Sequence, residues 1–434
     1  MLSSPIPFLS PSFPPQMINS TTITTAGAAV KRRKTHHTLH VDDDNQSLIP
    51  GLPDHIAQIC LNLVHPFTLF STCHSWRKLI YSPSFPPYLS IYALLLPSKY
   101  INETPNSANF TNSIEFASFD PISSKWLLLP PPPDPPLRLL VKHPSFISRN
   151  LPVQSVSVSG NLILLAATAD HFLPAISRPL VFNPLKKKWS YGPPLITPRR
   201  WCAAGALNDV VYVASGVGSH YNPEVARSVV KWDLNESSRS GPHYCTCNSD
   251  IYCNRKEGKN EWKWEEMSGL KDGKFSREAI DAIGWKGKLC MVNVKGDAAK
   301  EGIIYNVRSD TWHEMPQGML MGWRGPAAAM AEETIYMADE SKGALRKYDE
   351  EKDIWVEIVE NERLKGAEYV AAGGGRVCVV GGGGNEITIV DVVAEPPRVV
   401  VVESPLGFQV LNIHVLPRMS HLAEYSESIE QGEY

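Results

Sequence analysis

The stretch IYMADESKGALRKYDEEKDIW, residues 335–355, contains the pattern that decides the fold. A short apolar strand is followed by a second strand that ends in Tyr348-Asp349, and Trp355 comes six residues after that aspartate. An Asp side chain can cap the turn between two strands, and a Trp on the returning strand can pack between neighbouring sheets. The stretch therefore predicts three consecutive strands of one antiparallel sheet.

The same spacing recurs along the chain, which indicates a repeated structural unit. In each copy an aromatic residue precedes Asp or Asn, and a Trp follows six residues later; the further copies are Phe119-Asp120 with Trp126, Phe182-Asn183 with Trp189, and Tyr305-Asn306 with Trp312. A fifth copy, Trp232-Asp233, finds its Trp only at Trp262 or Trp264, which implies an insertion at about 235–260. A sixth, Val390-Asp391, has no Trp behind it.

The distance between copies gives the size of the unit. Asn306 and Asp349 are 43 residues apart, and Asp349 and Asp391 are 42 apart. This period suits a four-stranded blade of a β-propeller. Six copies therefore predict a mainly β protein with a six-bladed propeller over residues 88–416.

The first blade has too few strands of its own, because the sequence before the second blade offers three apolar segments, at 90–96, 114–119 and 126–129. We expect residues 409–415 to supply the fourth strand. Both ends of the repeat region would then close the ring and remove its exposed edge.

The composition sets the broad class. Hydrophobic residues make up 43% of the chain and charged residues 20%, with a net charge of −3, which is ordinary for a soluble globular protein. Nothing in the charge balance favours nucleic acid, and no apolar run approaches the roughly 20 residues that span a bilayer. Cys290 and Cys378 lie inside apolar runs, which favours a reducing compartment. We expect a location in the nucleus and/or cytoplasm and no cofactor.

The two ends of the chain have a different composition. Residues 1–47 are rich in Ser, Thr and Pro and include the basic cluster Lys31 to Lys34, so we predict a disordered tail. The basic cluster suits a nuclear import signal, a solvated charge run or part of a transit peptide, and these alternatives remain open. Residues 417–434 form a short acidic tail.

Residues 48–87 show helical periodicity. Pro53-Asp54 opens a helix that we expect Asp54 to cap, and Ile56, Ile59, Cys60 and Leu63 follow at helical spacing. A second amphipathic stretch extends from Leu69 through Trp76 to Ile80. Two or three such short helices cannot bury all of their apolar surface, which implies a partner.

These residues resemble an F-box. The resemblance is carried by Leu52-Pro53-Asp54 with Ile56 and Ile59, and by STCHSWRKL at 71–79. In that family the helices bind the Skp-type adaptor of a cullin ubiquitin ligase. The resemblance implies adaptor binding by Leu52, Pro53, Ile56, Ile59, Trp76 and Leu79. The chain departs from the family at His65-Pro66-Phe67, where an acidic turn is common.

The repeats resemble kelch repeats, because Gly381-Gly382 follows an apolar strand in a chain with the Tyr-Asp and Trp signature; a WD-repeat propeller is the alternative. An F-box followed by a kelch-like ring resembles the plant F-box/kelch-repeat proteins, with GLPDHIA at 51–57 and YSPSFP at 81–86 closest to the Skp-interacting-partner subgroup. The resemblance implies a non-catalytic substrate-recognition subunit of an SCF-type E3 ubiquitin ligase. Its partners would be the adaptor, through it cullin and a RING subunit, and a protein substrate.

The loops that enter the first strand of each blade predict a substrate-binding face. They combine arginines with aromatic residues, namely Arg149, Arg199, Arg200, Trp201, Arg277, Trp323, Arg324 and Tyr369. Guanidinium groups around one mouth of the ring favour an acidic or phosphorylated substrate. The alternative is that each arginine ties a loop to its neighbour.

Other candidate sites are weaker. His243, Cys245, Cys247 and Cys253 in the insertion are a weak candidate for zinc, although Cys-x-Cys is not the usual spacing. No catalytic residue can be assigned from the sequence. Two further classes stay open: a kelch-type metal-dependent enzyme, and a scaffold without a ligase partnership.

Overall fold

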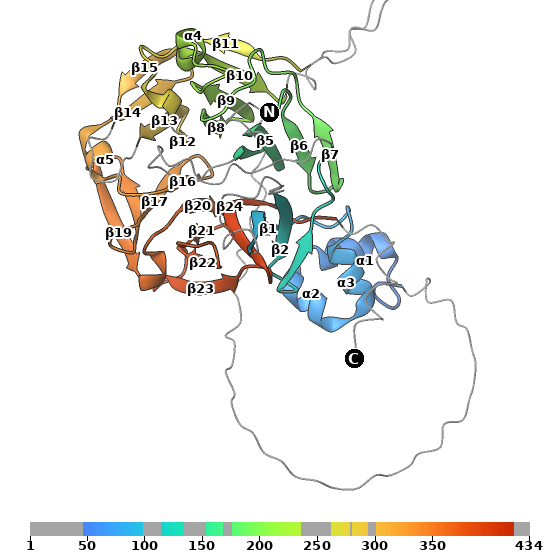
Figure 1. Cartoon of the computed structure of the whole chain (residues 1–434). Helices are drawn as coiled ribbons and strands as arrows, with labels where there is room; N and C mark the ends of the chain where they lie inside the picture. Colours follow the sequence, from blue (N-terminus) through green and yellow to red (C-terminus); the bar gives the residue numbers. More distant parts are fainter. Residues whose placement is uncertain are drawn as a thin grey trace, which may run out of the picture. The chain divides into compact units, whose positions relative to one another are not determined.

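A computed structural model describes residues 47–98, 114–133, 153–167, 176–235, 262–277, 280–293 and 301–420. The chain divides into two compact units, Met1–Pro86 and Pro87–Tyr434. Figure 1 shows helices in the first unit and a ring of sheets in the second. Within these ranges no helix has the length and apolar character needed to cross a membrane.

The first unit, which we call the helical unit, contains α1 (Asp54–Leu61), α2 (Pro66–Thr72) and α3 (His74–Ile80). The prediction that Asp54 caps α1 is wrong, since Pro53 occupies the N-cap and Asp54 Oδ1 instead accepts a hydrogen bond from Leu48 N at 3.0 Å. Proline suits helix starts because the first turn needs no backbone donor. The buried side chains that hold the unit together are Ala57, Leu61, Leu69, Leu79 and Ile80.

The second unit is a propeller of six four-stranded antiparallel blades, as predicted. From the inner to the outer strand, blade 1 contains β24 (Phe408–Pro417), β1 (Leu89–Pro97), β2 (Glu115–Asp120) and β3 (Lys125–Leu128). Blade 2 contains β4 (Val153–Val158), β5 (Asn161–Ala167), β6 (Leu180–Asn183) and β7 (Lys188–Tyr191). Blade 3 contains β8 (Ala203–Leu207), β9 (Val210–Ala214), β10 (Val229–Asp233) and β11 (Glu265–Met267).

The remaining blades complete the ring. Blade 4 contains β12 (Ile280–Trp285), β13 (Lys288–Asn293), β14 (Glu301–Asn306) and β15 (Thr311–Glu314). Blade 5 contains β16 (Ala327–Met330), β17 (Thr334–Asp339), β18 (Ala344–Asp349) and β19 (Ile354–Glu360). Blade 6 contains β20 (Tyr369–Gly373), β21 (Arg376–Val380), β22 (Glu386–Asp391) and β23 (Arg398–Glu403). Short helices lie in the connections: α4 (Pro223–Arg227), α5 (Gln317–Gly322), η5 (Lys274–Arg277) and η6 (Glu362–Leu364).

The ring closes as the sequence predicts. Strand β24 pairs antiparallel with β1, from Leu89 opposite Pro417 to Pro97 opposite Phe408. The last strand of the chain is thus the innermost strand of the first blade. Behind it Arg418 is buried, and its backbone N–H donates to the Tyr88 carbonyl.

The repeated tryptophans join neighbouring blades. Each indole N–H donates to a backbone carbonyl that lies at or just after the outer strand of the preceding blade, at 2.8 to 3.0 Å. The pairs are Trp126 with Glu403, Trp189 with Pro130, Trp264 with Pro193, Trp312 with Ser268, and Trp355 with Met319. We call these five contacts the tryptophan clasps. Among the described residues blade 6 has no such Trp, in agreement with the sequence.

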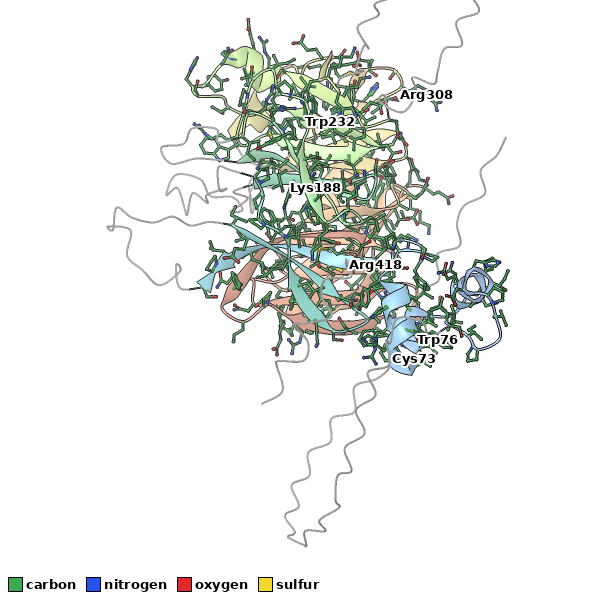
Figure 2. All side chains as sticks on the ribbon, turned by 90° about the vertical axis from the view of Figure 1, so that its right-hand side faces the viewer. Cys73, Trp76, Lys188, Trp232, Arg308 and Arg418 are labelled. Atoms are coloured by element: carbon green, nitrogen blue, oxygen red, sulfur yellow. The ribbon has the colours of Figure 1, made fainter. Side chains whose placement is uncertain are left out.

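The clasps identify the fifth repeat Trp. Trp264 makes the inter-blade hydrogen bond, whereas Trp262 packs edge-on against Trp232 with ring centroids 5.3 Å apart. Trp232 itself is fully buried and is labelled in Figure 2. Trp264 is therefore the equivalent residue, and the insertion in this repeat is longer than an alignment on Trp262 would give.

Small residues allow the inner strands to approach closely. A Cβ on Gly205 would lie 1.9 Å from the Ala282 carbonyl oxygen, and one on Gly284 would lie 2.2 Å from the Ala206 oxygen. Strands β8 and β12 accordingly pair in parallel, through Ala203 opposite Ile280. The inner strands can thus surround a narrow central channel.

Candidate functional site

The helical unit exposes an apolar stripe. Ile56, Ile59, Leu63 and Phe67 are 40%, 62%, 79% and 39% exposed, while Ala57 and Leu61 on the other side of α1 are buried. Residues three and four positions apart lie on one face of a helix, so Ile56 and Ile59 share a face of α1, and Leu63 follows at the same spacing just after the helix ends. We call the four exposed residues the apolar stripe. Large contiguous apolar surface on a soluble protein marks an interaction site.

The six predicted adaptor positions divide between surface and interior. Pro53, Ile56 and Ile59 are exposed, and Leu52 is half-buried. Of the last two positions, Leu79 is buried and Trp76 is half-buried. Leu79 belongs to the core of the unit.

Trp76, labelled in Figure 2, is half-buried, and its Nε1 donates to the Leu48 carbonyl at 2.6 Å. It therefore holds the segment before α1 in place.

Two residues of the apolar stripe are missing from the predicted set. Leu63 has the helical spacing that could have identified it, whereas Phe67 lies in the departure from the F-box pattern.

The connections of the ring define two faces. One face, which we call the entry face, carries the loops between blades and those between the second and third strands; the other, the turn face, carries the remaining hairpin turns. Of the predicted substrate residues, Arg149 lies outside the described residues. Arg277 ends η5, and its side chain is likewise outside the described part.

Arg199 and Arg200 hold loops together. Arg199 is 2% exposed, and its Nη1 donates to the Ser215 carbonyl at 3.0 Å and to Ser228 Oγ at 2.8 Å. Burial lowers the pKa of its guanidinium. Arg200 is also buried and lies over the Trp201 ring, 4.5 Å from its centroid. Both arginines thus tie a loop to its neighbour, which is the alternative that the sequence left open.

The other predicted residues of the entry face differ in exposure. Trp323 and Tyr369 are buried, Trp201 is half-buried and Arg324 is exposed. Among the predicted arginines whose side chains the structure describes, Arg324 is the one that is exposed on the entry face. The sequence predicted that these residues share one binding surface. In the structure some lie on the entry face and others are buried inside its loops.

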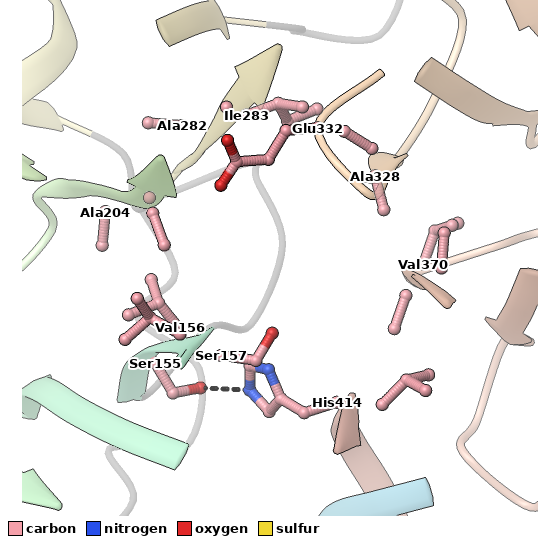
Figure 3. A pocket seen from close by; sticks show the side chains of 18 of the residues that line it. Ser155, Val156, Ser157, Ala204, Ala282, Ile283, Ala328, Glu332, Val370 and His414 are labelled. Atoms are coloured by element: carbon pink, nitrogen blue, oxygen red, sulfur yellow. Dashed lines mark hydrogen bonds between the residues drawn. The ribbon is translucent and has the colours of Figure 1, made fainter. Parts of the chain in front are cut away.

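A central channel of about 300 Å³ passes between the inner strands of all six blades. Its wall contains small apolar residues, among them Ala204, Ala282 and Ala328. Figure 3 shows that the polar side chains Glu332 and His414 point into it from opposite sides. The sequence pattern did not predict this site, because residues from six distant segments form it.

His414 is a buried histidine in the channel wall. Its Nε2 is 2.8 Å from Ser155 Oγ, and Asn412 Nδ2 donates to the same hydroxyl oxygen at 3.2 Å. Burial lowers the pKa of His414 to about 3. The imidazole is therefore neutral near pH 7 and hydrogen-bonds as a neutral group.

The described residues show no arrangement of three or more His, Cys, Asp or Glu side chains suited to a metal ion. The weak zinc candidates His243, Cys245, Cys247 and Cys253 lie outside the described residues. Burial raises the pKa values of the Cys202, Cys290 and Cys378 thiols to about 12. These cysteines stay protonated near pH 7 and are poor nucleophiles.

The fold and the apolar stripe define a class of protein in which a small helical interaction unit and a six-bladed propeller share one chain. No family model matches the sequence. The chain is 48% identical to the F-box/kelch-repeat protein SKIP25 of Arabidopsis thaliana over 90% of its own length and 93% of the relative's. It is 25% identical to the F-box protein AFR of the same plant, over 68% and 69% of the two chains.

A third relative is the F-box/kelch-repeat protein SKIP4 of Arabidopsis thaliana, at 22% identity over 72% of this chain and 75% of the relative. The 48% identity to SKIP25 over 90% of the chain shows that the chain belongs to the F-box/kelch-repeat protein family. The resemblance found in the sequence is thereby confirmed. The names of the relatives contain the F-box and the kelch repeat, which are the two parts that the sequence resembles.

Proposed function

We propose that this protein is the substrate-recognition subunit of an SCF-type E3 ubiquitin ligase. In this proposal the helical unit binds a Skp-type adaptor, which connects it to cullin and a RING subunit, and the propeller binds a protein substrate. The observation that carries the proposal is the apolar stripe on a unit of the F-box/kelch-repeat family. The location predicted from the sequence, nucleus and/or cytoplasm, is part of the proposal.

The apolar stripe has the chemistry of a protein interface. The fully buried centre of such an interface is more apolar than ordinary protein surface. Leu63 and Ile59 are the two most exposed members of the stripe, and burying one large aliphatic side chain contributes about 1.5 to 3 kcal/mol. An adaptor with an apolar groove would cover them. The half-buried Trp76 and buried Leu79 would support the stripe from inside.

The entry face of the ring is the proposed substrate surface. Large apolar side chains are exposed in its loops: Ile196, Tyr221, Met321 and Leu406. Arg324 adds an exposed positive charge. Loops on a rigid scaffold are frequent binding surfaces. An acidic or phosphorylated substrate remains part of the proposal through Arg324, Arg149 and Arg277, whereas Arg199 and Arg200 are engaged inside the loops.

Affinity purification of the tagged full chain tests the proposal. A carboxylate within the apolar stripe would be buried without a partner, so Ile59→Asp should remove the adaptor, cullin and RING subunit from the purified material. Leu128→Asp is the matched control, because Leu128 is a similarly exposed aliphatic residue on the outer strand of blade 1. Wild type and the control should retain all three partners.

Two outcomes would contradict the proposal. Absence of an adaptor from the wild-type material would favour the scaffold without a ligase partnership. Equal recovery of the adaptor with Ile59→Asp would show that the apolar stripe is not the docking surface.

A further inference from the structure

One end of the central channel carries a carboxylate that the fold holds in place. Glu332 lies in the turn between β16 and β17, where Ala331 and Glu332 adopt φ values of 51° and 57°. Its Oε1 accepts a hydrogen bond from Asn208 N at 2.8 Å, and its backbone carbonyl accepts one from Lys286 N at 2.8 Å. These contacts link the turn of blade 5 to blades 3 and 4. The carboxylate is therefore positioned over the channel.

The negative charge at this end has no basic counterpart. Neither Glu332 nor Asp209, which also lines the channel, pairs with Lys or Arg among the described residues. Asp209 accepts hydrogen bonds from two neutral groups, Ser159 Oγ at 2.7 Å and Asn235 Nδ2 at 3.2 Å. Burial raises the pKa of Glu332, and the nearby Asp209 carboxylate raises it further. A cationic ligand would relieve both effects.

The rest of the channel differs from this acidic end. Its wall includes the small inner-strand residues Ala204, Ala282 and Ala328. Opposite Glu332, His414 and Ser157 provide polar groups. Nε2 of His414 is engaged by Ser155, whereas Nδ1 has no hydrogen-bond partner among the described residues. The channel thus combines two carboxylates at one end with small apolar residues and neutral polar groups along its wall.

The size of the channel favours an organic ligand over a bare ion. Its volume of about 300 Å³ is far above the roughly 30 Å³ that one water molecule occupies in the liquid. It matches the lower end of small-molecule sites. Ser157 and Asp209 are exposed, so solvent reaches the channel.

We propose that the central channel binds a small organic ammonium compound that carries a hydroxyl group. The ammonium group pairs with Glu332 and Asp209, and a short aliphatic body contacts the alanines. The hydroxyl group meets His414 and Ser157, since a hydroxyl both donates and accepts and so fits either role of a neutral imidazole. This site shares no residue with the apolar stripe or with the exposed entry-face residues named above.

The test uses the full chain and 4-amino-1-butanol as the probe, with 1-butanol and butylamine as truncated analogues, measured by calorimetric titration. We expect wild type to bind the probe at least about tenfold more tightly than 1-butanol, because a charge-assisted hydrogen bond is stronger than one between neutral groups. Glu332→Gln should abolish this preference while retaining an acceptor for Asn208. Ser157→Ala should reduce the preference for the probe over butylamine.

Glu333→Gln is the matched control, because Glu333 is the adjacent exposed residue and is not part of the channel lining. It should bind like wild type. No measurable binding of the probe to wild type would overturn the proposal. The same conclusion follows if Glu332→Gln keeps the full preference for the ammonium group. If Glu332→Gln melts at a lower temperature than wild type, Asp209→Asn is used instead, because Asp209 is exposed. This variant should also lose the preference for the ammonium group, and a retained preference would overturn the proposal.

Discussion

The ring packs its repeat tryptophans between neighbouring blades, whereas the helical unit leaves large apolar side chains exposed. In the ring, each repeat Trp that makes a clasp donates its indole N–H to the preceding blade, so one blade covers part of the next. In the helical unit, Trp76 also donates to a backbone carbonyl, but Ile59 and Leu63 on the same unit face outward. A repeat can bury apolar surface against its neighbour, whereas three short helices are too few to do so. The ring therefore covers much of its apolar surface by itself, whereas the helical unit leaves Ile59 and Leu63 exposed.

Truncating a clasp should give the largest loss of stability. Trp189 and Trp264 are buried, so Trp189→Ala or Trp264→Ala should lower the free energy of unfolding by about 3 to 5 kcal/mol. Trp126 is half-buried and more open at its indole nitrogen, so its loss should cost less. Denaturant titration of the full chain checks the order. Unchanged unfolding midpoints for Trp189→Ala and Trp264→Ala would show that the repeat has been misinterpreted.

Acidification should weaken the ring by a smaller but graded amount. The pKa of His414 is about 3 in the folded protein, below its ordinary value near 6.5, so the unfolded chain binds more protons between these two pH values. The free energy of unfolding should therefore fall as the pH falls, by up to about 1.4 kcal/mol per pH unit from this residue.

Denaturant titrations at pH 7, 6 and 5 measure this slope. His414→Gln should reduce it, whereas His313→Gln, at an exposed histidine, should leave it closer to wild type. Identical slopes for wild type and His414→Gln would mean that His414 is not buried in its neutral form.

Replacing the indole while keeping an aromatic ring separates the hydrogen bond of a clasp from its packing. Trp189→Phe loses the N–H that donates to the Pro130 carbonyl but keeps a ring against Phe182. We expect a loss of about 1 kcal/mol for the hydrogen bond together with a modest packing cost, well below the loss in Trp189→Ala. Equal losses in both variants would assign the whole effect to packing or to distortion of the blade.

A substitution in the apolar stripe should have the smallest effect on stability. Because Ile59 is already 62% exposed, Ile59→Ser should change the free energy of unfolding by less than about 0.5 kcal/mol. Ile80→Ser, at a fully buried residue of α3, is the matched contrast and should unfold the helical unit. A large stability loss in Ile59→Ser would mean that the stripe is part of the core.

The sequence predicted those features that a fixed local spacing encodes. The offset of six between Asp or Asn and Trp identified the blades, and the incomplete first blade predicted the pairing of β24 with β1. In the fifth copy, the inserted residues hid which Trp is equivalent, and Trp264 was recognised by its hydrogen bond to Pro193.

The sites were harder to predict, because their residues come together through loop geometry. The pairing of Arg200 with Val217 across two loops places Arg199 inward, and residue type alone cannot distinguish such an arginine from an exposed one like Arg324. Glu332 reaches the channel through a turn in the left-handed backbone region. Nothing in the local sequence around Glu332 indicates that it contacts blade 3.

The heat-capacity change of adaptor binding tests the central claim most directly. Burial of apolar surface gives a negative heat-capacity change, so calorimetric titration of the full chain with a purified Skp-type adaptor at several temperatures should show one. Leu63→Ser removes the most exposed member of the apolar stripe, and it should weaken binding and make the change less negative while the melting temperature stays the same. A heat-capacity change near zero in wild type, or an unaltered one in Leu63→Ser, would contradict the claim that the apolar stripe is the adaptor interface.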